Sequence, residues 1–332
     1  MAIGPERLAA LNAAKLKTLT RGRVGDDAAP GALPGGAGLV VGTTAWVLLG
    51  ADAAHSLGAA LAWSHRRGAE TVNVVVDDPA AAGLLARRAL PFAPAPTIWR
   101  ADGADLAAVA PAPVPALRPV PGADDLRSLL AEAGLDAVDE DGAILGELLG
   151  LEVARITTGD DGPVLDVGVG RFDREMTEMT HAHLAPADRL HRAVEIVAEH
   201  RRPDAPPHPL NQLVPERWMR AALVADPSRI GVAALHPVPS AVGRANLKET
   251  AVASAVGLDT AGEPVVVTCS TGVDLDLVPA AADDRAARAD GARLVLAVPA
   301  RDALPLTRDL AARLAHPADV VGLDGEWRIP WA

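Results

Sequence analysis

Residues 254–276, with the sequence SAVGLDTAGEPVVVTCSTGVDLD, contain the pattern that decides the fold. An apolar run leads into a polar, glycine-containing turn at residues 259–262, and an unbroken apolar run follows at residues 265–267. Two such runs joined by a short polar turn predict a β-hairpin. A candidate helix and a further apolar strand come next. The segment therefore predicts an α/β unit that begins with a hairpin.

The first part of the chain shows the same alternation of strands and helices. Apolar runs at residues 45–49, 71–76 and 97–99 predict strands, with helical patterns between them. Their spacing matches that of the C-terminal unit. Either a duplication or two unrelated α/β units would produce this match, because strand–helix–strand spacing is narrow in all of them. We therefore predict an α/β fold with two three-layer-like β-α-β-α-β lobes, a middle β-hairpin segment and a helical insertion.

Changes in composition divide the chain into five predicted segments. A proline- and alanine-rich stretch at residues 110–122 cannot continue a helix or a strand, so it marks a boundary. The predicted segments are an N-terminal helix and linker (1–38), a first α/β lobe (39–109), a middle β-hairpin and helix (123–184), a helical, locally basic insertion (185–250) and a C-terminal lobe (251–332).

The C-terminal segment 254–324 resembles the catalytic core of PD-(D/E)xK nucleases in the order of its elements and in the run VGLDTAGEPVVV. In that family one hairpin strand carries an acid, and the next carries an acid and a lysine two residues apart. These groups hold Mg²⁺ and activate water. The corresponding positions here are Ser254, Thr268 and Ser270, whose side chains could not hold the metal. The resemblance implies a restriction-endonuclease-like fold and a binding or assembly role, with nucleic acid as one candidate partner.

Composition restricts the partners and the compartment. The formal net charge of −12 disfavours a large nucleic-acid footprint, because proteins that bind nucleic acid usually present a basic face. The single cysteine, Cys269, cannot form an intrachain disulfide, which fits a reducing compartment. No apolar run approaches the roughly 20 residues that cross a bilayer. We therefore expect a cytoplasmic protein without a membrane partner; a homo-oligomer remains open.

The middle hairpin contains the strongest candidate for a catalytic site. If Ile156 pairs with Val164, then Glu152 and Asp166 lie on one face as diagonal neighbours, close enough to share a divalent ion. An enzyme with this site would use Mg²⁺, and the sequence specifies no other cofactor. The same residues also fit a surface hairpin without a catalytic role.

The stretch GRFDRE places Arg171 and Asp173 at the junction between a strand and a helix. It is similar to the GxxDR element of RecB-like nucleases, which makes both residues candidates for the catalytic set. The alternative is that Asp173 is the cap or first-turn acid of the helix.

Candidate binding residues gather in the helical insertion. Arg217, Arg220 and Lys248 belong to a stretch with more cations than acids, while His208 and Asn211 lie in the proline-bounded loop PPHPLN. This loop could present His208 as an acid or a base. Solvated helices and a rigid surface turn would explain the same residues.

Three functions are compatible with these patterns. The first is a non-catalytic relative of nucleases that acts as a binding or assembly protein. The second is a Mg²⁺-dependent phosphodiesterase or nuclease with its site on the middle hairpin. The third is a small-ligand or nucleotide sensor in the first lobe, with its ligand past the strand ends near Asp77 and Asp78.

Overall fold

The computed structural model describes residues 4–25, 28–181, 183–244, 246, 247, 249 and 251–325. Its fold is α/β, as the sequence predicts, and the described residues form three β-sheets. Contacts divide the chain into two units. Unit 1 comprises residues 1–114, 273–283 and 304–320, and unit 2 comprises residues 115–272, 284–303 and 321–332. No helix in the described part is long and apolar enough to cross a membrane.

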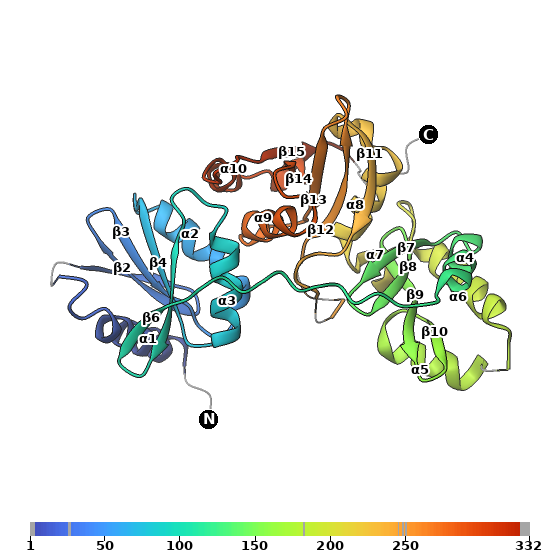
Figure 1. Ribbon diagram of the computed structural model, residues 1–332, viewed down its shortest axis with the longest axis horizontal. Helices are drawn as coiled ribbons and strands as arrows, with labels where there is room; N and C mark the ends of the chain where they lie inside the picture. The colour runs from blue at the N-terminus through green and yellow to red at the C-terminus, as the bar shows by residue number, and fades with distance from the viewer. Residues whose placement is uncertain are drawn as a thin grey trace. The chain divides into compact units, whose positions relative to one another are not determined.

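Unit 1 is built around a six-stranded sheet in the order β1-β2-β3-β4-β5-β6 (Figure 1). Neighbouring strands are antiparallel except β3–β4 and β4–β5, which are parallel and therefore need crossover connections. The strands are β1 (Ala29–Leu33), β2 (Gly36–Val41), β3 (Thr44–Leu48), β4 (Thr71–Val76), β5 (Thr97–Asp102) and β6 (Asp105–Ala108). The helices are α1 (Pro5–Leu19), the 3₁₀ turn η1 (Ala53–His55) and the crossover helices α2 (Leu57–His65) and α3 (Pro79–Ala89).

The predicted N-terminal linker is wrong, because β1 and the start of β2 lie within residues 1–38. Its glycines have a packing role instead. A Cβ at Gly31 or Gly38 would lie 2.6 or 2.3 Å from the Trp63 ring, so only glycine leaves room for this indole. Trp63 also donates its Nε1–H to the carbonyl of Ala32, 2.9 Å away. The first lobe consequently has six strands rather than three.

Unit 2 contains a four-stranded antiparallel sheet in the order β10-β9-β8-β7, so the middle segment is larger than the predicted hairpin. Leu130, Ile144, Leu151, Ile156 and Leu190 are fully buried in its core. The strands are β7 (Asp136–Glu140), β8 (Ala143–Leu148), β9 (Leu151–Gly159) and β10 (Gly162–Val167). The helices of this region are α4 (Asp124–Glu132), α5 (Gly170–His181), α6 (Pro186–His200), α7 (Pro209–Gln212), α8 (Pro215–Ala225) and the 3₁₀ turn η2 (Pro227–Ile230).

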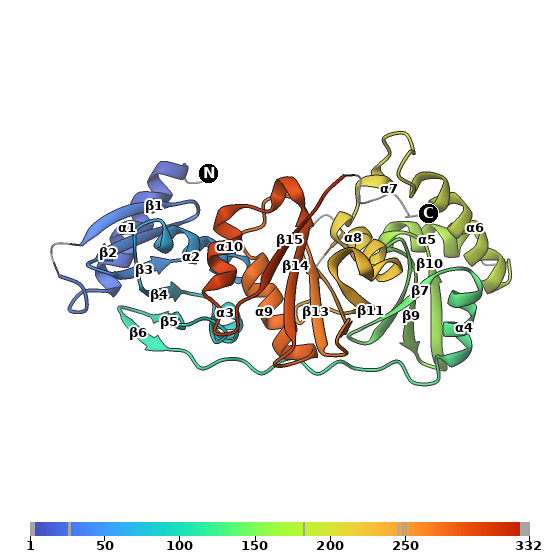
Figure 2. The same ribbon diagram turned by 90° about the horizontal axis from the view of Figure 1, so that it is seen from above.

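The hairpin predicted after residue 254 is present as β12–β13 of a five-stranded sheet, whose strands β13, β14 and β15 lie side by side in Figure 2. Asp259 closes the turn, because its carboxylate accepts the N–H groups of Glu263 and Ala261 at 3.0 and 2.8 Å. These bonds hold the pKa of Asp259 below its usual value. The elements are β11 (Val232–Val238), β12 (Ala253–Asp259), β13 (Pro264–Cys269), α9 (Leu277–Arg288), β14 (Arg293–Pro299), η3 (Ala300–Asp302), α10 (Pro305–Ala312) and β15 (Asp319–Leu323).

The six- and five-stranded sheets share a plan. Each begins with three antiparallel strands, β1–β3 or β11–β13, after which a helix leads to a parallel strand, β4 or β14. The strand β11 lies in the segment that the sequence predicts as a helical insertion, so that prediction is wrong for residues 232–238. Duplication of the lobes stays a prediction, since this order also arises in unrelated α/β units.

Candidate functional site

The three nuclease-like positions are buried, and two of them, Ser254 and Thr268, belong to a hydrogen-bonded polar cluster. Ser254 lies opposite Thr268 in the hairpin, and their hydroxyl oxygens are 2.9 Å apart. Ser254 also donates to the carboxylate of Asp284, on α9, at 2.6 Å. The same carboxylate accepts the N–H of Ala241 at 2.6 Å. Ser270 is buried as well, and its hydroxyl has no hydrogen-bond partner among the described residues. The cluster therefore ties α9 to the hairpin.

The predicted register of the middle hairpin is wrong by one residue. Ile156 pairs with Leu165, and Asp166 lies opposite Arg155. The cause is the turn: Gly159 pairs with Gly162, so only two residues connect the strands. Because side chains alternate along a strand, a shift of one residue changes which of them share a face.

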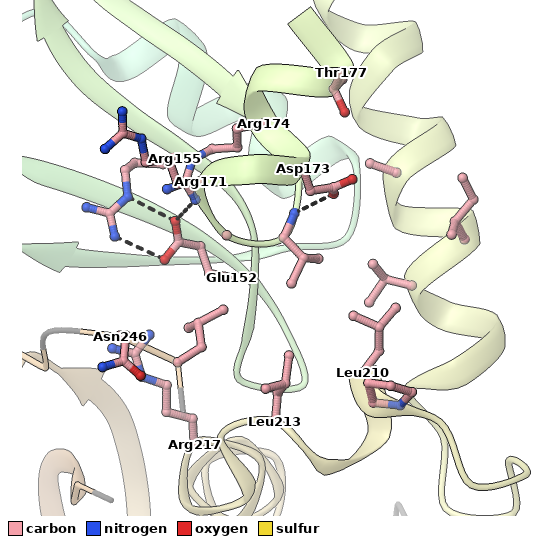
Figure 3. A pocket seen from close by; sticks show the side chains of 18 of the residues that line it. Glu152, Arg155, Arg171, Asp173, Arg174, Thr177, Leu210, Leu213, Arg217 and Asn246 are labelled. Carbon is pink, nitrogen blue, oxygen red and sulfur yellow. Dashed lines mark hydrogen bonds and ion pairs between the residues drawn. The ribbon is translucent and has the colours of Figure 1, made fainter. Parts of the chain in front are cut away.

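Glu152 is held by arginines. Its buried carboxylate accepts two hydrogen bonds from Arg155, at 2.9 and 3.0 Å, and one from Arg174 at 2.6 Å (Figure 3). The predicted sharing of a divalent ion with Asp166 has no support in this geometry. No group of three or more histidine, cysteine, aspartate or glutamate residues in the described part of the chain could hold a metal ion.

The junction between β10 and α5 is a tight glycine loop. A Cβ at Gly168 (φ 141°) would lie 2.7 Å from the backbone nitrogen of Arg174, so the close approach requires glycine. The Asp173 carboxylate accepts the N–H of Val169 at 2.7 Å, and the Arg171 guanidinium pairs with Glu175 at 2.7 Å. Asp173 thus acts as a local cap at the start of α5.

A cavity of about 760 Å³ opens between this loop, α5, α6, α7, the start of α8 and residues 244, 246 and 247, all in unit 2. Three carboxylates line it: Glu140, Glu152 and Asp173. The arginines that line it are Arg155, Arg171, Arg174, Arg189, Arg192, Arg217 and Arg244. Arginines therefore outnumber carboxylates in the lining, although Glu147, Glu175 and Glu216, which do not line the cavity, pair with three of these arginines.

Buried carboxylates position the arginines at the base of the cavity. Arg217 donates to Glu147 at 3.0 Å and to Glu140 at 2.7 Å, and Arg220 donates to the other oxygen of Glu147. Burial opposes the charge of Arg217, but Glu147 and Glu140 outweigh it and raise the pKa of Arg217 above its usual value. Arg220 is buried behind the lining, so it is not available to a ligand in the cavity.

Arg244 also lines the cavity and is mostly buried. Its side chain is only 7% exposed and pairs with Glu216 through Nη2. Its Nη1 is buried and has no hydrogen-bond partner in the described ranges. A buried guanidinium nitrogen without an acceptor is energetically unfavourable. The remaining predicted cation, Lys248, lies outside the described residues.

His208 and Asn211 shape the edge of the cavity. The Nδ1 of His208 accepts the N–H of Leu210 at 3.3 Å, which caps α7, and its ring stacks on His200 with centroids 3.8 Å apart. Asn211 donates to the carbonyls of His200 and Arg202 at 3.1 and 2.9 Å. His208 lines the cavity, whereas Asn211 holds the loop.

The acids proposed for a ligand site in the first lobe have local structural partners. Asp77 pairs with Lys15 at 2.5 Å, and Asp78 caps α3 by accepting the N–H of Ala80 at 2.9 Å. The sensor hypothesis therefore gains no support from these residues.

The structure brings part of the predicted set together. Glu152, Arg171, Asp173, His208 and Arg217 line one cavity, while Asp166, Arg220 and Asn211 do not. The predicted set omits Arg155, Arg174, Arg189, Arg192 and Arg244. The i, i+3 spacing of arginines at 171 and 174, and again at 189 and 192, is a signal that could have located them, because such pairs share a helix face. Comparison of the chain with family models, with curated proteins and with solved structures found no match.

Proposed function

We propose that the protein is a non-catalytic binding protein and that its ligand is an anion held in the arginine-lined cavity of unit 2. The observation that carries the proposal is the excess of guanidinium groups over carboxylates around one cavity. Its volume falls within the range of about 300–1,000 Å³ typical of small-molecule sites.

Arginine chemistry favours a carboxylate or a phosphate as the group that binds. The planar guanidinium presents paired donors that match the oxygens of these groups, and such charge-assisted hydrogen bonds are roughly twice as strong as neutral ones. The carboxylates of Glu152 and Glu147 hold several arginines in fixed orientations before a ligand binds. Preorganisation of this kind lowers the entropic cost of binding.

The nuclease-like resemblance remains part of the proposal. The succession of the hairpin β12–β13, α9 and β14 fits it, and Ser254, Thr268 and Ser270 make metal-dependent catalysis there chemically unfavourable. The Mg²⁺-dependent enzyme is the less supported alternative, because both oxygens of Glu152 accept hydrogen bonds from arginine rather than facing an open metal position.

Titration calorimetry with pyrophosphate tests the proposal. Arg171 and Arg192 are exposed at the cavity, so replacing them should leave the fold intact. We expect the Arg171→Gln/Arg192→Gln double variant to bind pyrophosphate roughly tenfold more weakly than wild type, since each lost charge-assisted contact is worth about 0.7 kcal/mol at an exposed position.

The matched control is the Arg66→Gln/Arg301→Gln double variant, which removes two exposed charges elsewhere and should bind like wild type. An equal loss of pyrophosphate affinity in both double variants would mean that net charge, rather than the cavity, determines binding. No binding of pyrophosphate to wild type would overturn the proposal, and binding of Mg²⁺ alone would favour the enzyme.

A further inference from the structure

We infer that the ligand of this cavity is amphipathic: an alkyl or acyl chain that carries a phosphate or carboxylate head. The inference rests on the proposed function and specifies its ligand class. It starts from the second wall of the cavity, which is aliphatic. This wall consists of Ala193, Ile196 and Val197 of α6, Leu210 of α7, Leu213 and Leu247.

Some arginines lie across the pocket from the aliphatic wall, whereas Arg189 and Arg192 share α6 with it. Figure 3 shows Arg155, Arg174 and Glu152 on one side of the pocket and Leu210 on another. The aliphatic wall is continuous with the core of the four-stranded sheet, where Val197 is buried and Leu210, Leu213 and Leu247 pack against the same cluster. An anion that filled only the arginine side would leave this wall in contact with water.

The helix α6 contributes first arginines and then aliphatic residues to the cavity lining. Arg189 and Arg192 lie in its first two turns, and Ile196 follows Arg192 by four residues, so the two share a face. Ile196 is 51% exposed, so its side chain is accessible to a ligand in the cavity. A ligand whose head lies near Arg192 would therefore place its chain along Ile196 toward Leu210.

The composition of the wall favours a chain over a nucleobase. Among the described lining residues the only aromatic ring is the imidazole of His208, and no phenylalanine or tryptophan is present. Bases commonly stack on aromatic rings or on arginine planes, and the six residues of the aliphatic wall offer neither. Isoleucine, valine and leucine side chains instead match the methylene groups of an aliphatic chain, whose burial is favourable in proportion to its apolar area.

The test is a chain-length series with one head group. We would titrate methyl, butyl and octyl phosphate into the full-length protein, each below its micelle concentration, together with octanoate and neutral octanol. Octyl phosphate should bind about tenfold or more tightly than butyl phosphate, because four additional methylenes are buried. Octanoate should also bind, whereas octanol should not.

Two variants test the contributions of the head group and of the aliphatic chain to binding separately. Ile196→Ser should lower the affinity for octyl phosphate several-fold and leave the affinity for methyl phosphate unchanged. Arg192→Gln should lower the affinity for both compounds. Leu258→Ser is the control, because Leu258 is 48% exposed on β12, outside the cavity lining, and it should change neither.

Equal affinity for methyl and octyl phosphate would overturn the inference and leave the proposed function standing. Binding of octanol as tight as that of octyl phosphate would overturn it as well, since the head would then contribute nothing. Failure of all the phosphates, pyrophosphate included, would instead remove the proposed function itself.

Discussion

Replacement of Arg201 by methionine is expected to lower the free energy of unfolding by about 3 kcal/mol or more. Arg201 is among the largest fully buried side chains. Its guanidinium donates to the carbonyls of Leu149 at 3.0 Å, Leu210 at 3.0 Å and Leu213 at 2.6 Å. It also lies 4.4 Å from the centre of the Trp218 ring, within range of a cation–π contact.

The backbone near Arg201 explains why this loss should be large. Leu149 and Val214 adopt φ angles of 47° and 42°, a left-handed conformation that costs about 1–2 kcal/mol for a residue with a side chain. Arg201 donates to the carbonyl oxygens of both, at 3.0 and 3.5 Å, and so stabilises that conformation. Methionine preserves much of the volume but none of the donors. Four partly or fully buried carbonyls would then lose the hydrogen bonds that Arg201 donates.

The adjacent Arg202 provides the control for this variant. Its side chain is 56% exposed and lies 3.8 Å from Asp204, so Arg202→Met should change stability by less than about 0.5 kcal/mol. Hydrogen exchange by mass spectrometry is the appropriate measurement, because peptides of unit 1 serve as an internal reference. Faster exchange confined to unit 2 in Arg201→Met is the expected result. Equal exchange in the two variants would contradict the claim that the hydrogen bonds of Arg201 stabilise unit 2.

Replacement of Glu147 by glutamine should cost about 3 kcal/mol of stability. Glu147 is buried and neutralises two buried guanidinium groups, those of Arg217 and Arg220. Glutamine keeps the shape but removes the charge, which leaves the two cations close together with Glu140 as the nearest remaining partner of Arg217. Uncompensated buried charge is much more costly than the loss of an exposed ion pair.

Two further variants make the Glu147 result specific. Glu263→Gln changes an exposed carboxylate immediately before β13 and should leave the free energy of unfolding nearly unchanged. The Glu147→Leu/Arg220→Leu double variant removes a buried pair together, and such replacements are often neutral or stabilising, so it should recover at least half of the loss. Chemical denaturation followed by tryptophan fluorescence measures all three. If the double variant is less stable than Glu147→Gln, uncompensated buried charge is not the main cause of the loss, and the Glu147–Arg220 ion pair itself stabilises unit 2.

Local signals in the sequence predict the elements with strong turn chemistry. The β12–β13 hairpin is predicted because Asp259 and Gly262 mark its turn, and the structure uses the Asp259 carboxylate to close that turn. The first two strands are missed for the opposite reason: Gly31 and Gly38 suggest a linker, and their actual role is to accommodate a ring from Trp63. A contact between residues so far apart in sequence leaves no local pattern.

The candidate site could be predicted only in part for a similar reason. The sequence identifies Glu152 from the predicted hairpin and Arg171 from the stretch GRFDRE, but it does not show that Arg174, on another element, pairs with Glu152. The partners Glu147 and Arg217 are 70 residues apart, so spacing along the chain gives no indication that they meet. Burial converts residues that suggest a solvated basic surface into the fixed base of a cavity.

A crystal structure of the protein grown with octyl phosphate tests the central claim most directly. We predict density in the cavity of unit 2, with the phosphate within hydrogen-bonding distance of Arg192 and with the chain against Ile196 and Leu210. An empty cavity in crystals that contain saturating ligand, or density for the ligand only at other positions, would contradict the account.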